Sequence, residues 1–187
     1  MGMKFRRNFI KFTVFSLLSP TAIFVSSANA STKNTYKPLM EVLFDIQKPV
    51  SITAAKYLQS KQADDYRYYL HLRSANLSIE DAASIADGIR ILHINPKVWL
   101  TSFSVSYNTG LQRQGLALLL SSLPDHLAAL GVVGCDLNDD SAYLIAEFIS
   151  KCQSLRMVCV EENNFSTLAK DNIVEAGSKL ARCTTIV

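Results

Sequence analysis

A short pattern of apolar residues recurs along this chain and constrains its fold more than any other feature. Three segments fit L-x-x-L-x-L-x-x-N/C, where L stands for any apolar residue: 100–108, 127–135 and 155–163. A fourth and degenerate copy covers 67–75, and there Ala75 replaces the final Asn or Cys. Self-similarity at a fixed interval predicts several stacked copies of one small structural unit.

The interval between copies is regular where the pattern is strongest. Phe103 and Leu130, at the same position of successive copies, are 27 residues apart, and Leu130 and Val158 are 28 apart. Leu70 precedes Phe103 by 33 residues, which indicates a longer connection between the first two copies. Between the copies, the apolar residues change to helical spacing. We expect helices over 79–92, 114–123, 139–151 and 167–182.

Each position of the pattern has a physical role. The two apolar side chains of L-x-L point to the same side of a strand, so they fill a core between strand and helix. The Asn or Cys turns inward, where its polar group bonds the backbone of its own turn and of the neighbouring copy. We expect Leu130, Val132, Leu144 and Phe148 to be buried in this way.

One strand–helix unit cannot bury its own apolar face, so the units have to stack. The predicted fold class is therefore α/β, a short solenoid with a curved parallel sheet inside and helices outside. An ordinary α/β domain with a small parallel sheet is the alternative. Before the repeats, the segment 31–66 contains apolar residues at helical spacing over 38–46 and 52–62. We expect this segment to cap the open end of the stack; the alternative is that it covers the inner face.

The copies resemble the leucine-rich repeats of the ribonuclease-inhibitor-like subfamily. The resemblance depends on the 27 to 28 residue period, the helical outer segments and the sequence Leu-Gly-Val-Val-Gly-Cys-Asp-Leu-Asn-Asp-Asp-Ser-Ala at 130–142. It covers about 67–183 and departs from the family pattern at Ala75. It implies a solenoid that serves as an interaction module, with leucine-rich repeats over 67–187.

The first thirty residues have the three parts of a secretory signal peptide. A basic segment, Lys4 to Lys11, precedes an apolar one over 12–25, and 26–30 ends in Ala-Asn-Ala. A segment of fourteen residues is short for a membrane span, which needs roughly 20, so cleavage before Ser31 is favoured over an uncleaved anchor. The sequence therefore predicts a bacterial protein that is periplasmic or secreted, with no stable membrane span after cleavage.

The charge of the chain is concentrated in that N-terminal segment. The net charge is +3, from 19 basic and 16 acidic residues. Four of the basic residues lie among the first eleven, and without them 15 basic residues face 16 acidic ones, a net charge of −1. A basic surface is what nucleic-acid binding requires, so we expect no nucleic-acid partner.

Four cysteines follow the predicted cleavage site, and export would permit disulfides. Their spacing does not match a zinc site, and we expect no metal or cofactor. Cys135 stands at the inward position of its repeat and should be a buried free thiol, whereas Cys159 should lie exposed on the inner face. Cys152 and Cys183 follow successive predicted helices, so a disulfide between them is left open.

Catalysis is not predicted, although the inner face carries nucleophilic residue types. His71, Ser104 and Cys159 are expected to point the same way, but His71 and Cys159 lie three strands apart, roughly 14 Å at the usual strand spacing. A base and its nucleophile need hydrogen-bond contact. No sequence motif supplies an orienting acid or an oxyanion hole for His71 and Ser104. The chain is therefore predicted not to be an enzyme, and a secreted hydrolase is the less favoured alternative.

The same face is instead predicted to bind another protein, which would be a host protein if the bacterium is host-associated. Solenoids usually bind through the face formed by their strands. Tyr, Arg and Met are also enriched at protein interfaces. The alternative role is a structural or accessory subunit of an envelope complex. The predicted partner-binding residues are Tyr69, His71, Arg73, Tyr107, Met157 and Glu161.

Overall fold

The computed structural model describes residues 34–62 and 64–187 of the chain. The predicted signal peptide, 1–30, lies outside the described residues. Within them the chain forms six α-helices, one 3-10 helix and five strands. In chain order these are α1 (Lys37–Asp45), α2 (Pro49–Gln59), β1 (Arg67–His71), α3 (Ile79–Leu92), β2 (Trp99–Ser104), η1 (Thr109–Leu111), α4 (Gln112–Leu120), β3 (Ala129–Gly131), α5 (Asp139–Lys151), β4 (Met157–Cys159), α6 (Thr167–Ser178) and β5 (Thr184–Ile186).

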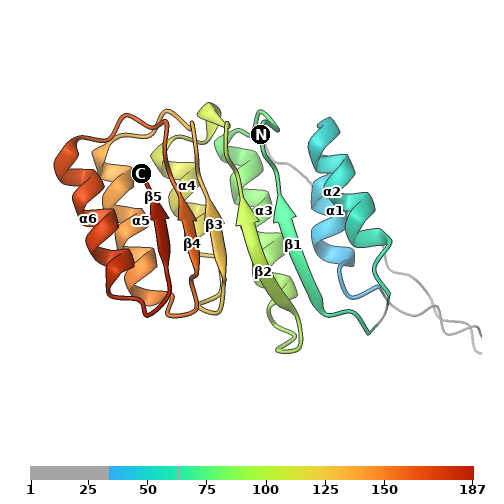
Figure 1. Ribbon diagram of the computed structural model, residues 1–187. Helices are drawn as coiled ribbons and strands as arrows, with labels where there is room; N and C mark the ends of the chain where they lie inside the picture. The colour runs from blue at the N-terminus through green and yellow to red at the C-terminus, as the bar shows by residue number, and fades with distance from the viewer. Residues whose placement is uncertain (1–33, 63) are drawn as a thin grey trace, which may run out of the picture. The chain divides into compact units, whose positions relative to one another are not determined.

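The strands form one parallel sheet in which the strand order follows the chain order, β1 to β5 (Figure 1). The register places the repeated apolar residues opposite one another: Leu70 pairs with Phe103, Phe103 with Leu130, and Leu130 with Val158. The predicted alignment of the four copies is therefore confirmed, and with it an α/β fold with a parallel sheet. A fifth strand, which was not predicted, places Thr185 opposite Val158.

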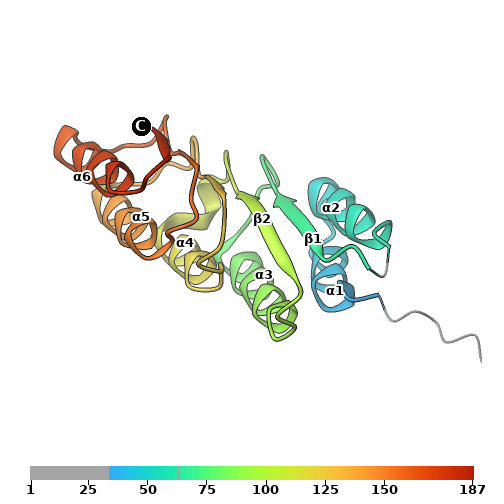
Figure 2. The ribbon, with the colours of Figure 1, turned by 60° about the horizontal axis from the view of Figure 1, so that its bottom comes forward.

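The helices that connect the strands lie together on one side of the sheet. Figure 2 shows α3, α4, α5 and α6 in one layer and the strands in another. The core between the layers contains the repeated residues themselves, with Leu70 and Phe103 1% exposed. α1 packs on α3 in the helix layer, and α2 lies next to β1. The N-terminal helices therefore stand at the β1 edge of the sheet and not over its open face.

Several helices begin at residues that satisfy their free N–H groups. Ser78 caps α3: its hydroxyl accepts a hydrogen bond from the Asp81 backbone N–H (3.2 Å), while the Asp81 carboxylate accepts one from the Ser78 N–H (2.8 Å). Ser166 caps α6 through the Ala169 N–H (3.3 Å). Lys48, which precedes α2, also contacts Asp81 and so ties the N-terminal helices to the first repeat.

The predicted core is confirmed except at one position. Leu130, Val132 and Phe148 are buried, but Leu144 is only partly buried. The buried stripe of α5 instead includes Ile145, which is fully buried. The helix is turned so that this stripe faces the sheet, which leaves Leu144 at its margin.

The Asn and Cys positions of the repeats point inward, as the pattern predicts. The Asn108 side chain is 1% exposed, and its Nδ2 donates to the carbonyls of Leu72 (2.8 Å) and Val105 (2.7 Å). Its Oδ1 accepts from the Leu77 N–H (3.0 Å). One side chain thereby satisfies backbone groups of two neighbouring repeats, groups that would otherwise be buried without partners.

The next two repeats follow the same arrangement. The Cys135 thiol lies 3.3 Å from the Val105 carbonyl, so the prediction of a buried free thiol is confirmed. Asn163 accepts from the Cys135 N–H (2.9 Å) and donates to the Val132 carbonyl (2.8 Å). These side chains link each turn to the preceding one and hold the strand ends in register.

No helix of the described ranges, 34–62 and 64–187, has the length and apolar character needed to cross a bilayer.

Candidate binding surface on the strand face

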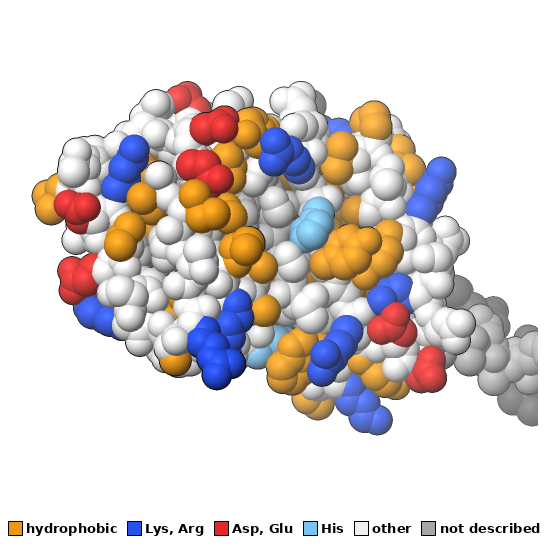
Figure 3. Space-filling view, viewed as in Figure 1, with side chains coloured by type: hydrophobic (Ala, Val, Ile, Leu, Met, Phe, Trp, Pro, Cys, Tyr) orange, Lys and Arg blue, Asp and Glu red, His pale blue; other side chains and the backbone are white. Residues whose placement is uncertain are grey.

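The side of the sheet that faces away from α3 to α6 is called the strand face below, and Figure 3 looks directly onto it. Alternate strand residues project from it, because successive side chains of a strand point to opposite sides. Large apolar residues on it are well exposed: Tyr69 on β1 (45%), Met157 on β4 (47%) and Ile186 on β5 (43%). Figure 3 shows hydrophobic side chains on both sides of a paler central stretch.

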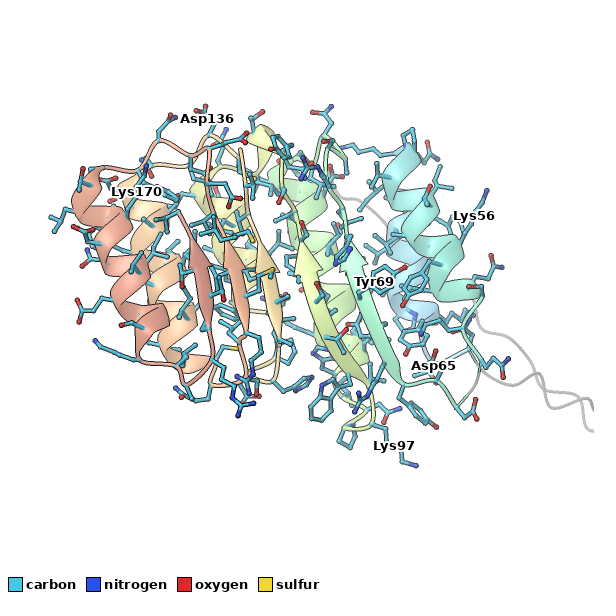
Figure 4. The ribbon with its side chains drawn as sticks, viewed as in Figure 1. Lys56, Asp65, Tyr69, Lys97, Asp136 and Lys170 are labelled. Atoms are coloured by element: carbon cyan, nitrogen blue, oxygen red, sulfur yellow. The ribbon has the colours of Figure 1, made fainter. Side chains whose placement is uncertain are left out.

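A stack of rings forms one side of the strand face, and we call Tyr57, Tyr69 and His71 the aromatic wall. The Tyr57 ring, from α2, stacks on the Tyr69 ring with centroids 4.2 Å apart, and the Tyr69 and His71 rings are 4.8 Å apart. Figure 4 shows Tyr69 on β1, beside α2. Tyr57 was not predicted, because the sequence pattern gives no sign of which face of α2 meets the sheet.

His71 also contacts the next strand, since its Nε2 lies 2.8 Å from the Ser102 hydroxyl. Burial of its ring lowers the pKa of His71 below the usual value, which keeps the imidazole neutral at pH 7. A neutral histidine beside a serine is the beginning of a nucleophilic pair. However, among the described residues no carboxylate bonds to His71, so the group that would orient the base is lacking here.

Small side chains occupy the middle of the strand face. Ser102 and Ser104 of β2 lie beside Ala129 and Gly131 of β3. A Cβ added to Gly131 would lie 2.9 Å from the Ser104 hydroxyl oxygen, so even alanine would crowd that position. The centre of the face therefore carries only short side chains, and it lies between the aromatic wall on one side and Met157 on the other.

A connected set of side chains lies where the strands end. The Arg73 guanidinium lies 4.0 Å from the centroid of the Tyr107 ring, and the Tyr107 hydroxyl donates to Glu162 (3.0 Å). Gly134 lies against the same ring: it has a φ of +61°, and a Cβ there would come within 2.8 Å of Tyr107. Tyr107 thus connects Arg73 on the β1 side of the face with Glu162 beyond β4.

Glu161 is the most unusual charged group of the strand face. Its Oε2 oxygen is buried and has no hydrogen-bond partner among the described residues. The pKa of the Cys159 thiol is raised, mainly by burial and to a smaller extent by the nearby negative charge of Glu161. Arg73 and Glu161 form no ion pair with any described residue. A buried carboxylate oxygen without a donor is costly unless a bound group supplies one.

The structure places the six predicted residues on two sides of the strand face. Tyr69 and His71 stand together in the aromatic wall, whereas Met157 and Glu161 lie on the β4 side. Arg73 and Tyr107 stack at the end of the face and connect its two sides. The alternation of the repeat pattern would place Ser106 and Val133 on the same exposed face as Arg73, but both are buried. They lie next to the loop in which the Tyr107 ring folds over Gly134.

A second cluster lies at the other end of the strands, around the only tryptophan of the chain. The Trp99 ring, 42% exposed, lies 4.0 Å from the His126 ring, and His93 is 6.0 Å from His126. These three residues line a hollow of about 520 Å³. Burial and the charge of His126 lower the pKa of His93 to about 4. Figure 4 labels Lys97 on the loop that leads into this region.

The remaining cysteines do not form a cross-link. All four cysteines are free thiols, so Cys152 and Cys183 are not paired. Cys152 is buried, with its thiol 3.1 Å from the Asp125 carbonyl, and Cys183 is partly exposed. Cys159, predicted to be exposed, is also only partly exposed. Over 34–62 and 64–187, no three or more His, Cys, Asp or Glu side chains are grouped so that they could hold a metal ion.

Comparison with known proteins gives no relative from which a function could be inferred. No protein-family model matches the chain, and no curated protein matches its sequence.

Proposed function

We propose that this chain is an exported bacterial protein of the ribonuclease-inhibitor-like leucine-rich-repeat type that binds another protein through its strand face and has no catalytic activity. The repeat assignment is supported by the register, which superimposes the four copies strand by strand. It is also supported by Asn108, Cys135 and Asn163, whose side chains connect successive turns. The export assignment depends on the sequence of residues 1–30.

The observation that supports binding most directly is the open, chemically mixed strand face. Tyr69 and Met157 each expose nearly half of their surface on it, and Arg73 and Glu161 have no charged partner in the described chain. Rigid aromatic anchors supply affinity at protein interfaces, and charged groups around them supply orientation. Because α1 and α2 stand beside β1, the described chain leaves this face free for a partner.

The test is the capture of partners by a variant that lacks both tyrosines of the strand face. Tyr69→Ala combined with Tyr107→Ala should weaken a true partner by more than about 1 kcal/mol, since aromatic residues dominate such interfaces. Tyr143→Ala is the matched control, because Tyr143 is 49% exposed on α5 in the helix layer. Circular dichroism would verify that each variant is folded.

Unchanged capture by the double variant would contradict the strand-face assignment. The next surface to test would then be the cavity of about 400 Å³ between α4 and α5, which includes Leu120 and Phe148 in its lining.

The compartment distinguishes the proposed role from an accessory role in the envelope. A protein that acts on partners outside the cell should accumulate in the medium, whereas a subunit of an envelope complex should stay in the periplasm. N-terminal sequencing of the protein from either compartment should begin at Ser31. An intact Met1 in a membrane fraction would contradict cleavage and export together.

A further inference from the structure

The charged groups without partners on the strand face have opposite signs and lie in the same row. Beyond the strand ends the backbone pairing continues: the Ser74 N–H donates to the Ser106 carbonyl (2.9 Å), Tyr107 to Val133 (2.7 Å) and Gly134 to Glu161 (3.0 Å). This pairing places Arg73, Ser106, Val133 and Glu161 side by side, one on each of four adjacent chain segments. Arg73 lies on the β1 side and Glu161 on the β4 side, and the pairing continues beyond β4 through the Val160 N–H and the Ile186 carbonyl (2.9 Å).

A second row has the same symmetry. Tyr69 pairs with Ser102, Ser102 with Ala129, and Ala129 with Met157. The two small side chains lie between the large exposed ones, Tyr69 and Met157, and the row continues beyond Met157 to Thr184 of β5. In both rows the two large or charged side chains belong to the β1 and β4 sides and are equally far from the line between β2 and β3.

This arrangement is complementary to itself. Consider a two-fold axis parallel to the strands and midway between β2 and β3, with a second copy of the chain facing the first. The β1 side of one copy then lies opposite the β4 side of the other, so Arg73 meets Glu161 twice and Tyr69 meets Met157 twice. An interface between identical subunits of this kind requires such self-complementarity. Ser104 and Gly131, the small residues beside the axis, place no bulky side chain between the copies.

We propose that the strand face binds the strand face of a second copy of this chain, in a two-fold dimer held by Arg73 and Glu161 of opposite copies. The partner's guanidinium pairs with the Glu161 carboxylate, since neither Arg73 nor Glu161 has an ion-pair partner among the described residues of its own copy. This dimer rests on the proposed function, because it uses the same strand face, with a second copy of this chain as the partner.

The size of the face predicts how strong this dimer is. Five strands span about 19 Å at the usual spacing of about 4.8 Å, and stable dimers generally bury more surface than such a face provides. We therefore expect a reversible dimer whose dissociation constant is micromolar or weaker. Self-association of this kind would also compete with other partners for the same face.

The test uses the two charges separately and then together. Sedimentation equilibrium of the protein, expressed with its own N-terminal segment, from about 1 µM to about 1 mM should show a monomer–dimer equilibrium. Arg73→Glu alone and Glu161→Arg alone should each weaken it at least about tenfold, because like charges then face one another. An equimolar mixture of the two variants should dimerise again, since each mixed pair contains two opposite-charge contacts.

Matched variants separate this effect from a general change of charge. Lys179→Glu and Glu147→Arg make the same reversals of charge on exposed residues of the helix layer and should leave self-association unchanged. If Glu161→Arg does not fold, Glu161→Gln replaces it and should weaken the dimer without restoring it in the mixture with Arg73→Glu.

Two results would overturn the dimer. One is a monomer at all concentrations. The other is a dimer whose dissociation constant stays the same in both charge variants, or is not restored when the two variants are mixed. Neither result affects capture of a different protein through Tyr69 and Tyr107, so the failure of this proposal is distinguishable from failure of the proposed function.

Discussion

Replacement of Asn108 by alanine should destabilise the fold strongly. The Asn108 carboxamide is 1% exposed and bonds four backbone groups, the Leu77 N–H and the carbonyls of Leu72, Val105 and Ser106. Each group left buried without a partner costs about 1–3 kcal/mol. Rearrangement and water entry recover part of that sum. We therefore expect Asn108→Ala to lower the free energy of unfolding by about 3–5 kcal/mol.

Urea titration followed by the fluorescence of Trp99, the single tryptophan, would measure this loss. Asn108→Cys should cost less, because Cys135 fills the equivalent position with a thiol that contacts a carbonyl at 3.3 Å. Asn172→Ala is the control, since Asn172 lies on α6 away from the turns, and it should change stability by less than about 1 kcal/mol. A loss below about 1 kcal/mol for Asn108→Ala would refute the view that these side chains hold the repeats together.

Three other consequences of the structure can be measured. Leu130→Ala should lower the free energy of unfolding by about 2–5 kcal/mol, because Leu130 is 2% exposed between sheet and helices, and an unchanged urea midpoint would place it outside the core. The pKa of His93 is about 4 in the folded chain and near 6.5 in an unfolded one, so as pH falls from about 6.5 to about 4 the unfolded state gains protons first and stability decreases. His93→Gln should flatten that dependence in urea titrations at several pH values, and an equally steep decrease would exclude His93 as its source. Iodoacetamide should alkylate the partly exposed Cys183 in the native protein before the buried Cys135 and Cys152, which should stay unreacted until unfolding, whereas mass spectra that show a Cys152–Cys183 bridge would contradict the free thiols.

The sequence predicted those parts of the fold that depend on local pattern. The bounds of α3 and α5 agree with the predicted ranges, because an apolar stripe coincides with a clear helix start in both. The helix predicted to reach Arg182 ends instead at Ser178. There Gly177 comes close to β5, so that a Cβ would lie 2.1 Å from the Thr185 hydroxyl oxygen. β5 itself was missed because Thr184 and Thr185 do not carry the apolar pattern, and the strand depends on pairing with β4.

The sequence predicted which residues of the candidate site share one face of the sheet, but not which of their side chains contact one another. A fixed repeat length determines which side chains share a row, and so Tyr69 and Met157 fall on the same face as expected. Tyr107 has a positive φ of 60°, which is rare for a residue with a large side chain, and no sequence pattern indicates it. That backbone conformation accompanies the stacking of its ring with Arg73 and its bond to Glu162. Tyr57 joins the site from α2 through tertiary packing alone.

Site-specific photo-crosslinking in the producing cells would test the binding role of the strand face most directly. A photoreactive phenylalanine analogue replaces either Tyr69 on the strand face or Tyr143 on the helix layer, two tyrosines that are 45% and 49% exposed. If the strand face binds partners, Tyr69 should yield discrete protein adducts in the medium or the periplasm, and Tyr143 should yield none. Adducts from Tyr143 with none from Tyr69 would contradict a binding role for the strand face.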